Sequence, residues 1–443
     1  MRLVSIRLRN VGVFEDATVR LAEGAAAPPH ASTPRDDDDD SAIELARPRP
    51  VTVLFGADGI GKTTLLSALA VTRPGYTLPP IPYPRAATAA GTAAVAPEGP
   101  SCVTTEWLLG EDDPARPHTL VVASPSAILD GETTETAGAR RREQALFDRR
   151  AQHEGGFVFV GFSGARWFSR TSNMLSVPER SILKYDVRHA ASFDDPTRAD
   201  LTRETKQVLS YAGIARALGN QREQYCHLER FDAAVREVVD VMLEPFGFSY
   251  AGVSPLSLEP EATDNAGHIV AFDALPRPAR HLVAFGALSL RAMFAAYPHS
   301  DDPREREAVV AIDDIEAQQD PAMLRMIVPL LRHALPNVQW VLTTSSTQLA
   351  LSCAPGEVVA LRKSGSENVE ATEGASCTDS VCVAPVVAVA DVHDQRNVEL
   401  ERRLHRFLDA RLRLRDELVR DLEHELVVNG EDHASARHHV TVA

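Results

Sequence analysis

One segment of the chain combines glycines, a lysine and two threonines at a spacing that suits phosphate binding. Its glycines allow backbone N–H groups to turn toward phosphate oxygens at the start of a helix. In this P-loop (Walker A) pattern the lysine reaches the β- and γ-phosphates of a nucleotide, and the following threonine hydroxyl binds magnesium. A chance match is the competing interpretation, and it does not account for the strand and helix expected on either side. The predicted nucleotide-binding residues are Gly56, Ala57, Asp58, Gly59, Ile60, Gly61, Lys62, Thr63 and Thr64.

Carboxylates that can complete such a site follow a second apolar run far along the chain. This run is typical of a central parallel strand and ends at Asp313. Magnesium in P-loop proteins needs a second anchor of this kind, so we expect Asp313 and Thr63 to bind the metal together. Asp314 and Glu316 lie next to it, and either can orient or deprotonate an attacking water, although surface acidity is the alternative. With Lys62, these two carboxylates are the candidate catalytic residues.

Alternating strands and helices must position these residues. A helix is predicted over residues 65–70, and another over 320–335 with a bend at Pro329. A compact nucleotide-binding fold then places Lys62 and Asp313 within a few ångströms of each other across adjacent strands. The strands expected in this core are residues 51–55, 157–162, 307–312, 337–344 and 357–361.

The sequence between the two motifs predicts an inserted β-lobe and a helical lobe. Period-two alternation indicates a strand at residues 2–8, a turn then leads to a second strand at 17–21, and strand-like runs follow at 102–109 and 119–123. Residues 195–243 have a helical pattern instead. The predicted parts are the following. Residues 1–163 are the N-terminal ATPase core with the β-lobe and a disordered Asp-rich loop (22–50), 164–264 a mainly helical insertion, 265–375 the C-terminal part of the core, and 376–443 an irregular linker with a C-terminal amphipathic helix.

Composition excludes several classes of protein. The 443 residues are 44% hydrophobic and 24% charged, with a formal net charge of −16, so a broadly basic nucleic-acid-binding chain is excluded. No apolar stretch of about 20 residues is present, and we therefore expect no membrane span. The five cysteines are odd in number and mostly far apart. They predict reduced thiols and a cytoplasmic location.

Several segments together resemble the RecF/SMC/OLD-like branch of ABC-type P-loop ATPases, which includes many bacterial proteins of the predicted "AAA family". The resemblance covers residues 1 to about 365. It implies an α/β fold, an ABC/RecF-like P-loop NTPase head with an N-terminal β-lobe and an inserted helical lobe. Such a head binds ATP and Mg2+ and forms a homodimer around two nucleotides. The segments are residues 2–10, 13–16, 56–64, 312–316, 320–321 and 340–346.

The resemblance also implies a signature loop, which contacts the γ-phosphate bound to the partner head. By position it aligns with residues 275–280, before a helix expected over 282–297. Arg277 and Pro278 stand where the family has Ser and Gly, and a proline has no backbone N–H to donate. Arg277 or Arg280 is a candidate arginine finger acting across the dimer.

Three further positions depart from the family pattern. Asp314 replaces the usual catalytic glutamate, Ser345 replaces the histidine of the switch segment, and Asp58 replaces the more usual asparagine of the phosphate loop. Together with the altered signature, these departures predict ATP binding with slow or partner-dependent hydrolysis.

Three functions stay open at this point. The first is an ATPase that uses ATP to control head dimerisation, in DNA maintenance or antiphage defence by family analogy. The others are a non-hydrolysing, ATP-gated scaffold for an effector protein and an ABC-transporter-type subunit, which the missing Ser-Gly signature disfavours. Two weaker signals leave alternatives: Phe14 lies near the adenine or in the core, and the cations and aromatics of residues 166–170 with Arg188 contact nucleic acid or support packing.

Overall fold

The computed structural model describes both motif segments, residues 56–64 and 312–316. Residues 1–383 form one compact unit and 384–443 a second. Most of the predicted Asp-rich loop (22–50), the irregular linker and the C-terminal helix lie outside the described residues. The two ends of that loop are not irregular as predicted, because Ala22–Glu23 and Arg47–Pro48 pair as two short antiparallel strands. The described residues are 1–23, 47–48, 50–75, 99–109, 118–124, 127–153, 157–172, 175, 200–219, 226–297, 300–354, 356–364 and 368–373.

A six-stranded sheet forms the core of the first unit. Its order is β15-β14-β5-β13-β12-β8, and all neighbouring pairs are parallel except β14 and β15. Every residue of β5, β12 and β13 is buried, as expected of a parallel sheet covered on both faces. The strands are β5 (Val51–Phe55), β8 (Phe159–Phe162), β12 (Ala308–Ile312), β13 (Val338–Thr344), β14 (Val358–Ser364) and β15 (Asn368–Glu373).

The expectation that the two motif strands are adjacent is wrong. Strand β13 lies between β5 and β12 and pairs with both of them. The sequence carries no sign of this order, because all three strands are mainly apolar and any of them fits a central position. The inserted strand has a consequence for the site, since its end contributes a side chain there.

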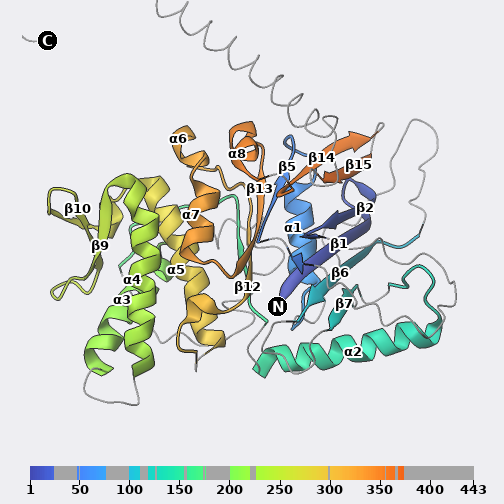
Figure 1. Ribbon diagram of the computed structural model, residues 1–443, viewed down its shortest axis with the longest axis horizontal. Helices are drawn as coiled ribbons and strands as arrows, with labels where there is room; N and C mark the ends of the chain where they lie inside the picture. Colours follow the sequence, from blue (N-terminus) through green and yellow to red (C-terminus); the bar gives the residue numbers. More distant parts are fainter. Residues whose placement is uncertain are drawn as a thin grey trace, which may run out of the picture. The chain divides into compact units, whose positions relative to one another are not determined.

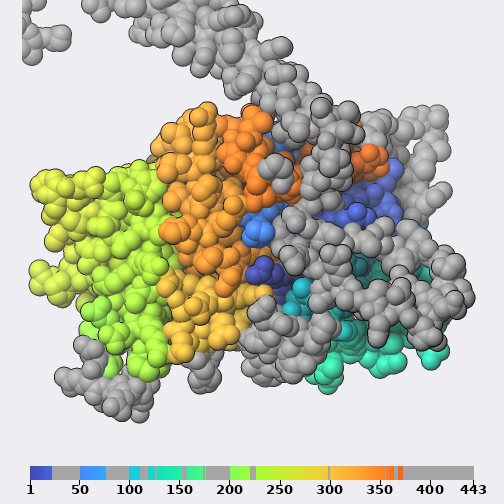
Figure 2. Space-filling view, viewed as in Figure 1, coloured from blue at the N-terminus to red at the C-terminus, as the bar shows by residue number. Residues whose placement is uncertain are grey.

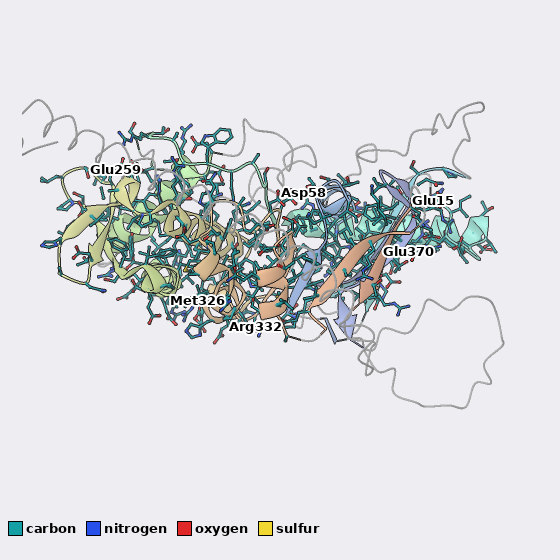
Figure 3. All side chains as sticks on the ribbon, turned by 90° about the horizontal axis from the view of Figure 1, so that it is seen from above. Glu15, Asp58, Glu259, Met326, Arg332 and Glu370 are labelled. Carbon is teal, nitrogen blue, oxygen red and sulfur yellow. The ribbon has the colours of Figure 1, made fainter. Side chains whose placement is uncertain are left out.

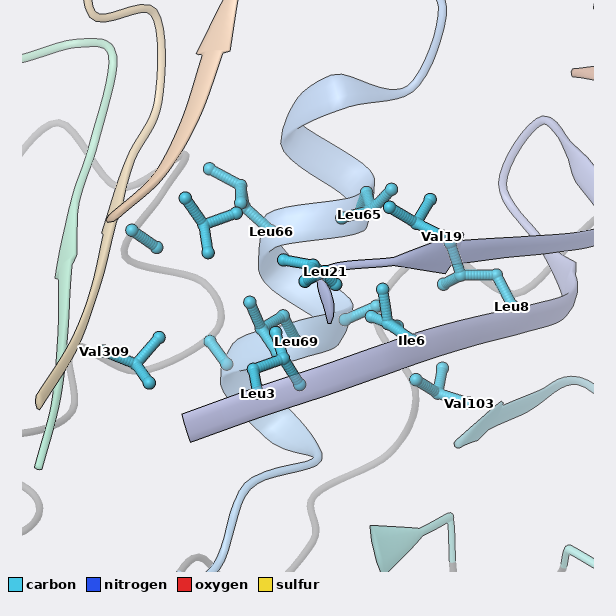
Figure 4. Packing of buried hydrophobic residues seen from close by; sticks show 14 of the residues in the cluster. Leu3, Ile6, Leu8, Val19, Leu21, Leu65, Leu66, Leu69, Val103 and Val309 are labelled. Atoms are coloured by element: carbon cyan, nitrogen blue, oxygen red, sulfur yellow. The ribbon is translucent and has the colours of Figure 1, made fainter. Parts of the chain in front are cut away.

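A second, antiparallel sheet of order β2-β1-β6-β7 forms the predicted β-lobe. Helix α1 (Lys62–Val71) lies between the two sheets, and Leu65, Leu66 and Leu69 pack with residues of β1 and β12 in one hydrophobic cluster (Figure 4). Helix α2 (Thr134–His153) packs against β7 (Figure 1). The strands are β1 (Arg2–Val11), β2 (Phe14–Arg20), β6 (Cys102–Leu108) and β7 (Thr119–Ala123); a short pair joins β3 (Ala22–Glu23) to β4 (Arg47–Pro48).

The helical lobe contains α3 (Thr202–Gly219), α4 (Cys226–Leu243) and α5 (Arg277–Ala296). Helix α4 also contacts α7 (Ile327–Ala334), so the lobe adjoins the helices that follow β12, as the space-filling view shows (Figure 2). The prediction of a mainly helical insertion misses a three-stranded sheet. Its strands are only six, five and three residues long, which leaves a weak signal. They are β9 (Phe248–Val253), β10 (Pro260–Asp264) and β11 (Ile269–Ala271).

The helix predicted with a bend at Pro329 is instead two helices. α6 (Pro321–Leu324) ends and α7 begins at Ile327, so the break lies upstream of the proline. Pro329 occupies the first turn of α7, where a residue needs no N–H donor. The short helix α8 (Thr347–Ser352) follows β13.

The predicted fold class is confirmed. A parallel α/β core carries the P-loop, an antiparallel β-lobe includes the N-terminal strands, and a helical lobe is inserted between β8 and β12. The elements predicted around the motifs also occur within a few residues of the expected positions. Among the described residues, no helix has both the length and the apolar character that crossing a membrane requires.

Candidate functional site

The phosphate loop connects β5 to α1, and its glycines are required by close neighbours. Gly61 adopts a φ of 95°, in the left-handed region that favours glycine. A Cβ atom there would lie 2.7 Å from Val13 Cγ2 and 2.8 Å from Phe14 Cε2. A Cβ on Gly56 would lie 3.0 Å from the carbonyl oxygen of Leu361. Phe14 is thus a fully buried core residue behind the loop, so of its two interpretations the structure supports core packing over adenine contact.

Lys62 lies at the first position of α1 with its side chain turned over the loop. Its Nζ atom donates to the carbonyl oxygens of Gly56 at 2.7 Å and Ala57 at 3.1 Å, and lies 3.6 Å from Asp58 Oδ1. The Asp58 side chain is 92% exposed and lies between the helical lobe and the β-lobe, which Glu259 and Glu15 mark in Figure 3. The ammonium group therefore stands at the loop, next to the N-terminus of α1, where phosphate oxygens would be favoured.

The structure brings the two predicted metal ligands together. Thr63 Oγ1 donates a hydrogen bond to Asp313 Oδ2 at 2.8 Å. The other carboxylate oxygen, Asp313 Oδ1, accepts a 2.6 Å bond from Thr343 Oγ1 at the end of β13. The strand that separates β5 from β12 thus supplies the hydroxyl that orients Asp313. Thr343 is a residue of this candidate site that the sequence argument missed, although a hydroxyl at the end of a buried strand is a usable signal.

Asp314 lies beside this pair in a strained backbone. Its φ is 44°, which is uncommon for a residue other than glycine. Its N–H donates to Thr343 Oγ1 at 2.8 Å. Burial, and then the neighbouring carboxylates of Asp313 and Glu316, raise the pKa of Asp314 above the ordinary 3.8. A partly buried acid with a raised pKa suits a proton acceptor, and among the described residues no hydrogen bond engages its carboxylate.

Glu316 has a different environment. Its Oε1 atom accepts hydrogen bonds from the backbone N–H of Ser345 at 2.6 Å and from Ser345 Oγ at 2.9 Å. The carboxylate thus joins the β12 loop to the segment after β13. Its other oxygen, Oε2, is buried and has no hydrogen-bond partner among the described residues. Of the two candidate catalytic carboxylates, Asp314 is the one with neither oxygen held by a hydrogen bond among the described residues.

The signature-like residues form the first turn of a helix instead of a loop. Helix α5 begins at Arg277, five residues before the predicted start, because Pro276 and Pro278 favour a helix N-terminus. Arg277 is exposed, whereas the guanidinium of Arg280 lies over the Phe168 ring at 5.2 Å. Arg277 is therefore the better placed of the two to reach a second molecule.

Arg166, which the sequence left open between nucleic-acid contact and packing, is buried with 1% exposure. Its guanidinium donates to backbone carbonyl oxygens of the loop after β12. The neighbouring Gly164 approaches the same loop, since a Cβ on it would lie 3.1 Å from Asp314 Oδ2. Packing is the correct alternative for Arg166, and Arg188 lies outside the described residues.

Three solved structures of SMC heads align with most of this chain. An SMC head domain from Thermotoga maritima aligns over 84% of this chain and 99% of its own, with 11% identity and a TM-score of 0.39. An SMC head bound to the C-terminal winged-helix domain of ScpA aligns over 84% and 98%, with 12% identity and a TM-score of 0.44. A third, from Pyrococcus furiosus, has an extended coiled coil and is bound to the C-terminal domain of ScpA. It aligns over 84% and 96%, with 12% identity and a TM-score of 0.40.

No protein-family model matches the sequence. The likeness to SMC heads concerns the fold, and the roles proposed below rest on residues of this chain. On its own topology and loop geometry, the chain is an α/β protein with a P-loop between β5 and α1.

Proposed function

We propose that this protein is a magnesium-dependent ATPase whose phosphate loop is residues 56–64. The observation that carries the proposal is the 2.8 Å hydrogen bond between Thr63 Oγ1 and Asp313 Oδ2. These two oxygens come from the first turn of α1 and the end of β12, which the chain separates widely. Their contact brings the phosphate loop and the end of β12 together in one site. Either segment alone would be weaker support for nucleotide binding.

The residues present fit ATP and Mg2+. A threonine hydroxyl and a carboxylate are hard oxygen ligands of the kind that magnesium takes, with the phosphates and water completing its shell. Thr63 and Asp313 would hold the ion. Lys62 and the N-terminus of α1 would hold the phosphates. When bound, the metal neutralises charge on the phosphate oxygens.

Within this site, Asp314 is proposed to orient the attacking water and accept its proton. Glu316 is proposed to hold the segment after β13 through Ser345 rather than to act on water. A serine carries no positive charge toward the γ-phosphate, and the side chain of Asp314 is one methylene shorter than the glutamate usual at this position. Both features favour hydrolysis that is slow or depends on a partner.

The association of two heads around ATP is part of the same proposal. The exposed Arg277 at the first turn of α5 is the group proposed to cross to the nucleotide of the partner head. A role in DNA maintenance or antiphage defence, with an effector protein as partner, is proposed by family analogy alone. The four-part division of the chain into 1–163, 164–264, 265–375 and 376–443 also stays a proposal.

A second function, a nucleotide-gated scaffold that does not hydrolyse ATP, is favoured by Pro278. This residue lies in the first turn of α5 and supplies no backbone N–H to a nucleotide on the partner. The two functions differ in turnover and agree on ATP binding.

The test is ATP binding and hydrolysis by the purified protein with and without magnesium. Lys62→Ala should lower nucleotide affinity and any turnover by about a hundredfold or more, because it removes the cation at the phosphates. Lys363→Ala is the matched control, since Lys363 is an exposed lysine of β14. Equal ATP binding by the wild type and Lys62→Ala would refute the proposal, whereas binding without turnover would support the scaffold.

A further inference from the structure

Arg166 makes an unusual set of contacts for a buried arginine. Its Nη1 atom donates to the carbonyl oxygens of Ser163 at 2.9 Å and Asp313 at 2.6 Å. Its Nη2 atom lies within 2.7 Å of the Asp314 carbonyl oxygen, 3.3 Å of that of Ile315 and 3.4 Å of that of Ala317. One guanidinium therefore contacts the backbone of most of the loop that carries the candidate metal ligand and proton acceptor.

The loop at residues 313–319 needs such support. Asp314 and Gln318 both have positive φ values, 44° and 63°, which side-chain-bearing residues rarely adopt. Strained backbone of this kind persists only where surrounding contacts determine it. The side chain of Gln318 donates to the carbonyl oxygen of Arg166 at 3.0 Å, so the arginine holds the loop from its backbone as well.

The other surroundings of Arg166 fix its own position. The guanidinium lies 5.1 Å from the centre of the Phe285 ring of α5. The residue after it, Trp167, accepts a backbone hydrogen bond from Leu201 at the start of α3. Burial lowers the pKa of Arg166 to about 10, with the carboxylates of Asp313, Asp314 and Glu316 acting in the opposite direction. At neutral pH the group is thus a buried cation among three carboxylates.

A lysine could not replace these contacts. Its ammonium is a compact point charge on a flexible stem, whereas the planar guanidinium presents donors in a fixed fork. Because the Arg166 side chain is only 1% exposed and its guanidinium contacts the backbone of the loop, we expect no direct contact between it and a bound nucleotide. Its effect on chemistry would pass through the position of Asp314.

We propose that Arg166 is the positioning residue of this site, which holds residues 313–317 in the conformation that places the Asp314 carboxylate beside Asp313. The inference rests on the proposed ATPase function. It assigns to a residue of the β8–α3 connection a role in hydrolysis but not in ATP binding.

The test uses the full-length Arg166→Lys and Arg166→Met variants. The expected result is an ATP dissociation constant within about threefold of wild type and a kcat lower by about ten- to a hundredfold, as found when a supporting residue around an active site is removed. Amide hydrogen exchange of the nucleotide-free variants should rise in residues 313–319 and stay unchanged in the phosphate loop. Where Arg166→Met does not fold, Arg166→Lys carries the test.

Arg140→Lys is the matched control. Arg140 is a buried arginine of α2 that donates to the carbonyl oxygen of Ala127 and to Glu132, away from the site. The Arg140→Lys variant should have the wild-type kcat and the wild-type rate of amide hydrogen exchange in residues 313–319. Unchanged exchange in that loop, or an equal loss of ATP affinity and kcat, would overturn the positioning role. Failure of the proposed function would instead appear as absent ATP binding in the wild type, and the exchange experiment does not depend on turnover.

Discussion

The two loops that form the site are held in place by different means. The phosphate loop follows β5 and adopts left-handed conformations at Gly59 and Gly61, which have no side chain to strain. The loop after β12 adopts the same kind of conformation at Asp314 and Gln318, which do. The first is supported mainly by its own residue types, and the second by side chains from β13 and from the β8–α3 connection.

This difference indicates how the two loops respond to change. Binding of phosphates depends on a short segment whose geometry is local. The geometry beside Asp313 depends on Thr343 and Arg166, which lie far from it in sequence. We therefore expect substitutions to separate ATP binding from hydrolysis.

The largest effect is expected for Asp314→Asn. Removing the proton acceptor should lower kcat by about 10²–10⁴-fold. Because the pKa of Asp314 is raised, the wild-type rate should increase with pH over a range above 3.8, the ordinary pKa of the side chain. Rates measured as a function of pH should lack this rise in the variant; a rise that persists there would assign it to another group.

The same substitution should raise the stability of the fold at neutral pH while it lowers kcat. The folded state binds the Asp314 proton more tightly than the unfolded chain does, so this carboxyl stabilises the fold below pH 3.8 and that contribution is lost as pH rises through the raised pKa. In denaturant unfolding, Asp314→Asn should be more stable than wild type at pH 7, and the difference should shrink on acidification. A variant less stable than wild type at pH 7 would contradict the assigned pKa direction.

Two threonines that bond to Asp313 allow a matched comparison. Thr63→Val should lower magnesium-dependent ATP affinity by about ten- to a hundredfold, because it removes a proposed metal ligand. Thr343→Val should instead destabilise the protein by about 1–3 kcal/mol, since it leaves the N–H of Asp314 and one oxygen of Asp313 without their partner. Magnesium titration of ATP binding and denaturant unfolding measure the two effects in both variants. A larger loss of magnesium-dependent affinity in Thr343→Val than in Thr63→Val would contradict the assignment of Thr63 as the metal ligand.

Two glycines of the phosphate loop give a contrast in stability alone. Gly61→Ala should cost about 2–5 kcal/mol of stability, because the new Cβ meets Val13 and Phe14 in addition to the backbone strain. Gly59→Ala should cost about 1–2 kcal/mol, since its Cβ would meet nothing within 4 Å. Thermal or denaturant unfolding measures both, and equal losses would refute the packing argument.

The same division explains what the sequence could predict. Gly56 to Thr64 form a contiguous pattern whose chemistry is local, and the apolar run ending at Asp313 identifies its strand. The position of β13 between β5 and β12, and the reach of Arg166 to the loop, depend on contacts between distant segments. Three buried strands of similar composition carry no record of their order. An arginine beside Trp167 and Phe168 has the same appearance in a sequence whether it is exposed or buried.

The most direct test of the account is the mass of the Asp314→Asn variant with and without ATP and magnesium, with hydrolysis followed in the same samples. If the phosphate loop binds ATP and the loop after β12 carries the proton acceptor for hydrolysis, the variant should still bind ATP. It should then form a dimer that persists and release almost no phosphate. Wild type should form the dimer more transiently or to a lesser extent. A variant that turns over ATP at the wild-type rate, or one that no longer binds ATP, would contradict the separation of the two loops.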